Sequence, residues 1–253
     1  MGLNVYAGSL TRYYSKDWRP VQQNEPITDG KKMAPHPSKY PRALPSEQWD
    51  ELQETNERWR DEVLKVVSAK IQYPVEQWCE DVGIGYYTHN LTWQSYFAVM
   101  ISAACLSYSQ ALPRDIPTHE PLHQHPMFRK AYLDDSNPVS YLLRTEWWIP
   151  SQYEFIFTCK GPDGQPKTVS STKILLRWLV ELNNNFFHAN EDYLTTWCQS
   201  EGPRRNESGN MRWKEGQYRP VYPFVSYARH GFAVATKAAQ YSIQHHVPLL
   251  LHY

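Results

Sequence analysis

The chain has 253 residues, enough to bury a substantial core without disulfides or structural metals. Its lysines plus arginines equal its aspartates plus glutamates at 26 each. This balance excludes the positive charge typical of nucleic-acid-binding proteins and gives no attraction to an anionic membrane. Aromatic residues make up 14%, and Trp and Tyr suit both cores and binding surfaces. We therefore expect a globular protein without nucleic-acid or membrane partners, whose composition permits an aromatic recognition surface.

The cysteines and the N-terminus give no sign of export. The four cysteines are Cys79, Cys105, Cys159 and Cys198, and none forms a C-x-x-C pair. Such spacing in a chain of this length is typical of reduced, mostly buried thiols rather than of a disulfide scaffold. Residues 1–10 contain neither the basic region nor the long apolar run of a secretory signal. The sequence therefore predicts a cytoplasmic protein.

One uncharged segment tests the prediction of a non-membrane protein. Residues 91–113 contain no charged side chain and are long enough to span a bilayer. The same segment contains seven Ser, Thr and Gln residues, which favour a central helix packed on most sides. Asn90 or Thr92 can cap this helix, and we expect it to end near Pro113.

The first half of the chain begins with a predicted strand and a loop. Apolar residues alternate over residues 3–8, which is the period of a half-buried strand. Six prolines between residues 18 and 45 disfavour regular structure and predict a long loop. Ser46 is a good N-cap for the segment that follows. Helical spacing of apolar residues there predicts a long helix that ends before Pro74.

The second half contains a hairpin and several helices. The Gly-Pro-Asp-Gly turn at 161–164 lies between two alternating segments and predicts a β-hairpin over residues 153–170. Residues 201–216 are polar, charged and rich in Gly, which predicts an exposed loop. Residues 247–253 read as a terminal strand that can pair with the N-terminal strand. Helical periodicity and capping residues predict further helices, over 127–134, 171–186, 192–198 and 224–245.

These elements favour the α/β class, with α+β as the alternative. We expect several helices packed on a small mixed sheet that includes the N- and C-terminal strands and the 153–170 hairpin. The chain contains no internal repeat and no convincing linker. The sequence therefore predicts a single globular domain over residues 1–253, with a long Pro-rich loop at 18–45.

One motif matches that of a zinc hydrolase. His119, Glu120 and His123 form the pattern H-E-x-x-H, in which a helix presents two zinc-ligating histidines one turn apart and a general base. Pro121 and Pro126 leave room for little more than one helical turn, and His125 is the only nearby candidate for a third ligand. The alternative is a histidine-containing surface loop, which we favour. We predict no metal site and no cofactor.

A cluster at the exit of the first strand is the candidate binding site. It consists of Arg12, Tyr13, Tyr14 and, just beyond, Trp18. Strand ends often bind ligands in open α/β sheets, and an Arg fork flanked by aromatic rings can bind a carboxylate or phosphate. In the alternative interpretation, the tyrosines pack under the Pro-rich loop and Arg12 forms a structural ion pair. The segment 144–148 (Arg-Thr-Glu-Trp-Trp) allows the same two interpretations.

Both ends of the chain are similar in sequence to one protein family. Residues 1–14 (MGLNVYAGSLTRYY), the helix containing Gly231-Phe232-Ala233 and the strand 248–253 (PLLLHY) resemble an uncharacterised bacterial protein family. Proteins of this general kind are similar to immunity proteins, which neutralise a bacterial toxin by binding it. The resemblance implies a cognate toxin as protein partner, and it implies no catalytic residues.

Two hypotheses about function follow. The first is a non-enzymatic binding protein, most concretely a cytoplasmic immunity protein that blocks a cognate toxin by steric occlusion and charge complementarity. The alternative is a hydrolase, either zinc-dependent through the HEPLH motif at 119–123 or acting on an anionic ligand near Arg12. The absence of an intact catalytic motif favours the first hypothesis.

Overall fold

The computed structural model describes residues 3–18, 43–115, 121–200, 210–214, 217–221 and 223–253. The chain divides into two compact units whose segments alternate along the sequence. The first unit contains residues 91–145 and 174–237 together with Leu3, and the second contains residues 4–90, 146–173 and 238–253. The single-domain organisation expected for residues 1–253 stays a prediction.

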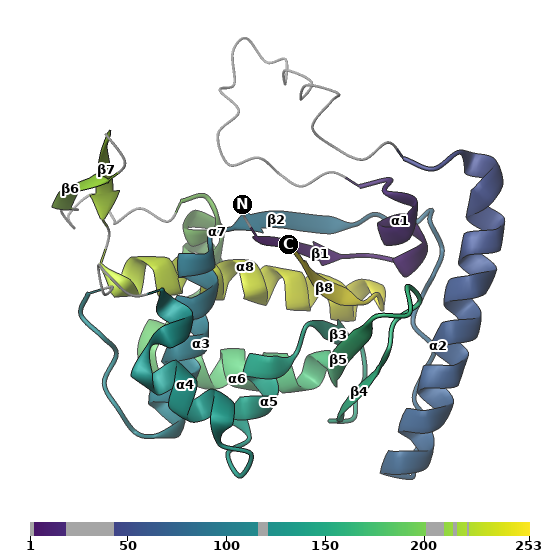
Figure 1. Cartoon of the computed structure of the whole chain (residues 1–253), viewed down its shortest axis with the longest axis horizontal. Helices are drawn as coiled ribbons and strands as arrows, with labels where there is room; N and C mark the ends of the chain where they lie inside the picture. Colours follow the sequence, from purple (N-terminus) through teal and green to yellow (C-terminus); the bar gives the residue numbers. More distant parts are fainter. Residues whose placement is uncertain (1–2, 19–42, 116–120, 201–209, 215–216, 222) are drawn as a thin grey trace. The chain divides into compact units, whose positions relative to one another are not determined.

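A six-stranded mixed sheet confirms the α/β class. Its strands lie in the order β2-β1-β8-β3-β5-β4 (Figure 1). As predicted, the N- and C-terminal strands pair, in antiparallel orientation, and the hairpin over 153–170 forms from β4 and β5. The strands of the sheet are β1 (Leu3–Ala7), β2 (Tyr87–Leu91), β3 (Trp147–Ile149), β4 (Ile156–Lys160), β5 (Pro166–Ser171) and β8 (Leu249–His252).

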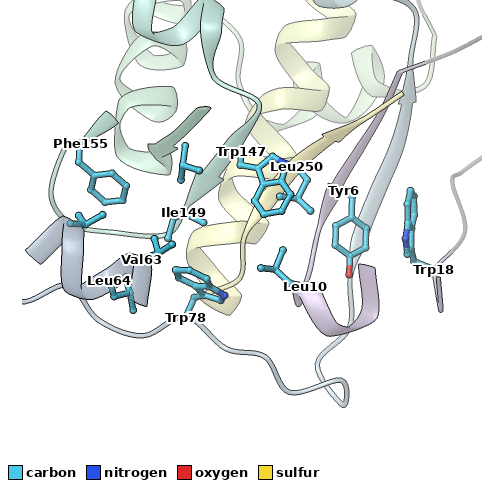
Figure 2. Packing of buried hydrophobic residues seen from close by; sticks show 12 residues of the cluster. Tyr6, Leu10, Trp18, Val63, Leu64, Trp78, Trp147, Ile149, Phe155 and Leu250 are labelled. Carbon is cyan, nitrogen blue, oxygen red and sulfur yellow. The ribbon is translucent and has the colours of Figure 1, made fainter. Parts of the chain in front are cut away.

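The core of the second unit follows from the register of this sheet. Residues that face each other on neighbouring strands point to the same side. The register joins Tyr6 to Leu250, Leu250 to Trp147, Trp147 to Val169, and Val169 to Phe157. The first four are buried, and Phe157 packs against their cluster. Figure 2 shows Tyr6, Trp147 and Leu250 in this cluster. One face of the sheet is therefore a continuous apolar surface.

Two helices supply side chains to this apolar cluster. The short helix α1 (Leu10–Ser15) contributes Leu10, and the long helix α2 (Trp49–Ile71) contributes Val63, Leu64 and Val67. Their spacing of one, three and four residues forms one stripe of α2, as the sequence predicted. A 3-10 turn over Ser46–Gln48 precedes α2, so Ser46 begins that turn instead of capping the helix.

The first unit is mostly helical. A ring cluster of Phe187, Trp197 and Phe232 marks its core, with 4.7 Å between the centroids of Phe187 and Phe232. The structure confirms the predicted helices. The helices lying wholly or partly in this unit are α3 (Trp93–Ser107), α4 (Pro126–Leu133), α5 (Val139–Arg144), α6 (Thr172–Leu182), α7 (Glu191–Cys198) and α8 (Phe224–His245).

Helices α1 and α5 and strands β2 and β3 were not predicted, and three further details differ from the prediction. The uncharged helix α3 begins after its cap Thr92 as expected but ends at Ser107, because the following residues form a hydrogen-bonded turn. The predicted loop at 201–216 is wrong in its second part, where β6 (Asn210–Lys214) pairs with β7 (Gln217–Val221). The helix predicted over 171–186 ends in a π-helical turn, Asn183–Phe187. No helix in the described ranges has the length and hydrophobicity needed to cross a membrane.

Candidate binding site

Helix α1 positions the predicted cluster. Ser9 caps the helix, because its Oγ accepts a hydrogen bond from the Arg12 backbone N–H at 3.3 Å. Lys16 ends the helix in the left-handed conformation, with φ of 62°. Between these caps α1 turns back over the sheet, so that Tyr13 reaches His252, the residue paired with Asn4 near the start of β1. Helix α1 begins at Leu10, shortly after β1 ends at Ala7, so the cluster starts beside the exit of that strand, and Tyr13 reaches from there to His252.

A buried carboxylate fixes this helix. Glu80 is 2% exposed, and its Oε2 accepts hydrogen bonds from the backbone N–H and the hydroxyl of Thr11 at 2.9 and 3.0 Å. Its Oε1 accepts from Trp78 Nε1 at 2.6 Å. Burial raises the pKa of Glu80, whereas these hydrogen bonds and the charge of Arg60 oppose the increase. Glu80 is thus a structural anchor that the sequence analysis missed.

Arg12 is engaged inside the protein. Its guanidinium donates to the carbonyl of Val82, lies 3.7 Å from the Asp17 carboxylate and stands 5.2 Å from the centre of the Tyr86 ring. The side chain is 15% exposed. This placement agrees with the structural ion pair that was one of the two interpretations. A role of Arg12 in binding an anionic ligand stays a prediction.

The aromatic members of the cluster do lie together. The rings of Tyr13 and Trp18 are stacked, with centroids 5.7 Å apart and planes 14° from parallel. The Trp18 indole also meets Tyr6 at 4.9 Å and the edge of His252 at 5.2 Å. Tyr14 meets the Tyr13 ring at 5.2 Å in an edge-on arrangement and packs against Trp147 at 6.5 Å. Three of the four predicted residues therefore take part in aromatic packing, and Tyr13 is the one that also borders a pocket.

A small pocket opens beside Tyr13. Its volume is about 120 Å³. Its walls combine a carboxylate, an ammonium group, an imidazole, two phenols and apolar surface. The lining residues are Tyr13, Glu146, Trp147, Lys167, Leu251, His252 and Tyr253.

The pocket exists because the central strand β3 starts late. Glu146, just before β3, still bonds both neighbouring strands: its N–H donates to Thr168 and its carbonyl accepts from Leu251, both at 3.1 Å. Strands β5 and β8 continue past this point, to Lys167 and His252. The short strand therefore leaves a gap between two longer strands, and their side chains border it.

The titratable groups of the pocket are suited to recognition at neutral pH. Burial, and after it the charges of Asp163 and Tyr253, raise the pKa of Tyr13 to about 12. Burial and the charge of Lys16 lower the pKa of His252, so its ring is neutral at neutral pH. A hydrogen bond of 2.8 Å joins Tyr13 Oη to His252 Nδ1. Neither group is poised to exchange protons near pH 7.

The pocket also offers two opposite charges. Glu146 Oε1 accepts a hydrogen bond from the Tyr253 hydroxyl at 3.0 Å. The Lys167 ammonium lies 5.8 Å from the centre of the Trp147 ring. Within the described part of the chain, neither Glu146 nor Lys167 forms an ion pair. The charge of each side chain is therefore available to a ligand.

Comparisons with known proteins find no match. No protein-family model, no curated protein and no solved structure is similar to this chain. The site therefore has to be interpreted from its own residues.

The described part of the HEPLH motif does not line this pocket. His119 and Glu120 lie outside the described residues, so the zinc alternative stays a prediction. His123 is in a 3-10 turn over Leu122–Gln124, and His125 Nδ1 accepts from the Met127 N–H at 3.2 Å as the cap of α4. Among the described residues, no three His, Cys, Asp or Glu side chains are grouped to hold a metal ion.

Most of the pocket residues were missed by the sequence analysis. Glu146 and Trp147 belong to the second cluster that was noted, and His252 and Tyr253 belong to the predicted terminal strand. Lys167 had no signal beyond its place in the hairpin. Only the pairing of distant strands brings these side chains to Tyr13.

Proposed function

We propose that this chain is a non-enzymatic binding protein, an immunity protein that neutralises a cognate bacterial toxin in the cytoplasm by binding it. The observation that carries the proposal is the pocket beside Tyr13, with its converging polar and aromatic side chains. Its volume of about 120 Å³ is well below the roughly 300–1,000 Å³ of typical small-molecule sites. A pocket of this size suits one side chain of a protein partner.

The chemistry around the pocket supports recognition over catalysis. Tyr13 keeps its proton and His252 stays neutral at neutral pH, so both act as hydrogen-bonding groups. Tyr253 is 69% exposed and offers the rigid amphipathic surface that is enriched in protein interfaces. Two thiols are poor nucleophiles, because burial raises the pKa of Cys105 and of Cys159 to about 11.

Co-expression tests this proposal. Each product encoded beside this chain is expressed alone and together with it, and growth and copurification are measured. We expect one product to be toxic alone, to be tolerated with this chain and to copurify with it. If no neighbouring product is toxic alone, the immunity function is refuted.

A pair of variants tests the pocket as the contact surface. Tyr253→Ala combined with Lys167→Ala should weaken binding of the copurifying partner at least about tenfold, as expected for loss of interface side chains worth more than 1 kcal/mol. Lys65→Ala, an exposed change on α2, should bind like the wild type. Unchanged affinity in the double variant would place the interface elsewhere while leaving the immunity function intact.

A further inference from the structure

The open edge of the sheet at β4 is partly covered by side chains of α2. Among the described residues, strand β4 is the last in the sheet, with β5 as its only neighbouring strand. An edge strand presents backbone N–H and C=O groups to which another strand can pair, and natural proteins usually block such edges. The hydrogen bonds of β4 show which groups face outward.

The ladder between β4 and β5 fixes this direction. Ser171 N–H donates to the Phe155 carbonyl at 3.1 Å, and Gly161 N–H donates to the Gln165 carbonyl at 2.8 Å. In an antiparallel pair, inward and outward residues alternate. With the register Thr158 opposite Thr168, the residues at 155, 157, 159 and 161 bond to β5. The backbone groups of 156, 158 and 160 therefore point away from the sheet.

Two side chains of α2 donate hydrogen bonds to carbonyls of β4 that point away from the sheet. Trp59 Nε1 donates to the Lys160 carbonyl at 2.7 Å, and Lys70 Nζ donates to the Ile156 carbonyl at 3.4 Å. Trp59 and Lys70 are three helical turns apart on one side of α2, about 16 Å along its axis. The two carbonyls are four residues apart on an extended strand, about 14 Å. Because the two spacings match, α2 can lie beside β4 and form one hydrogen bond near each end of the strand.

We propose that α2 closes the β4 edge against strand addition, and that this edge, once opened, pairs with β4 of a second copy of this chain. The outward groups are symmetric about Thr158, which is exposed. Antiparallel pairing of two β4 strands about Thr158 places Ile156 opposite Lys160 of the second copy, so like charges do not meet. An isologous contact of this kind closes as a two-fold dimer. This inference is independent of the proposed function.

Removal of the two donors tests the proposal. Trp59→Phe keeps an aromatic ring beside Trp78 and Trp147 but lacks the N–H, and Lys70→Met keeps the apolar stem but lacks the ammonium. Sedimentation velocity over a concentration series compares the double variant with the wild type. We expect self-association to strengthen at least about tenfold, equivalent to about 1.4 kcal/mol. Lys65→Met, on the exposed side of α2, should sediment like the wild type.

A third substitution identifies the contact. Thr158→Pro removes an outward N–H without removing a bond to β5, and proline is tolerated at such positions of edge strands. Added to the double variant, it should restore wild-type sedimentation. The proposal is overturned if the double variant associates no more than the wild type, or if Thr158→Pro leaves its association unchanged. If the double variant does not fold, Lys70→Met alone is measured, and the absence of any increase in association then counts against the proposal.

Discussion

Loss of the Glu80 carboxylate should strongly destabilise the fold. Glu80→Ala deprives the Thr11 backbone N–H and the Trp78 indole N–H of their acceptor, while both lie in a buried region. A buried donor without a partner costs about 1–3 kcal/mol. The Thr11 hydroxyl also loses the acceptor of its proton, although it still accepts from Asn56 Nδ2, 3.4 Å away. The two unsatisfied N–H donors alone predict a loss of about 2–6 kcal/mol in the free energy of unfolding.

This loss is a large part of the total stability, which is about 5–15 kcal/mol for typical proteins. Glu80→Gln keeps one side-chain oxygen and loses the other acceptor position. It should therefore lower the free energy of unfolding by about 1–3 kcal/mol. Urea denaturation followed by far-UV circular dichroism measures both values. Glu62→Ala, an exposed change on α2, is the control and should stay within about 0.5 kcal/mol of the wild type. If Glu80→Ala also stays within that range, the assignment of Glu80 as the anchor of α1 is wrong.

Three further predictions concern stability and pH. Because burial raises the pKa of Glu80, the part of its contribution to stability that depends on bound protons is fully present below the ordinary value of 4.5. This part is lost as the pH rises through the raised value, whereas the hydrogen bonds that the carboxylate accepts remain; the free energy of unfolding should therefore fall less over this range in Glu80→Gln than in the wild type. A Cβ at Gly231 would lie 2.3 Å from the Ser95 carbonyl oxygen, so Gly231→Ala should lower the melting temperature, with a cost of at least about 1–3 kcal/mol; an unchanged melting temperature would contradict this close approach. The buried Ser171 hydroxyl has no hydrogen-bond partner among the described residues, so Ser171→Ala should be neutral or stabilising by up to about 1 kcal/mol in urea denaturation. Ser242→Ala is the matched comparison, because the Ser242 hydroxyl donates a hydrogen bond at 2.6 Å to a backbone carbonyl. This substitution should lower the free energy of unfolding by about 1 kcal/mol. Equal effects of Ser171→Ala and Ser242→Ala would contradict the assignment of one hydroxyl as unpaired and the other as hydrogen-bonded.

Local patterns were sufficient to predict most of the secondary structure. The helix over 224–245 and the cap at Thr92 depend on neighbouring residues, so periodicity and capping chemistry reveal them. The hairpin between β4 and β5 depends on a turn sequence with a known backbone geometry. By contrast, β3 has only three residues, too few for any periodicity to be detected.

The pocket beside Tyr13 and the covered β4 edge could not be predicted from the sequence, because both depend on tertiary structure. The sequence identified Tyr13 as an aromatic residue near a strand, but its neighbours His252 and Lys167 come from strands that meet only through long-range pairing. In the same way, an exposed lysine and a tryptophan of α2 cover an edge strand that lies about a hundred residues away. Composition and periodicity specify which segments become strands and helices, because those choices depend on local backbone and side-chain energetics. The order of strands in the sheet decides which polar groups meet, since that order depends on the burial of apolar faces across the whole unit.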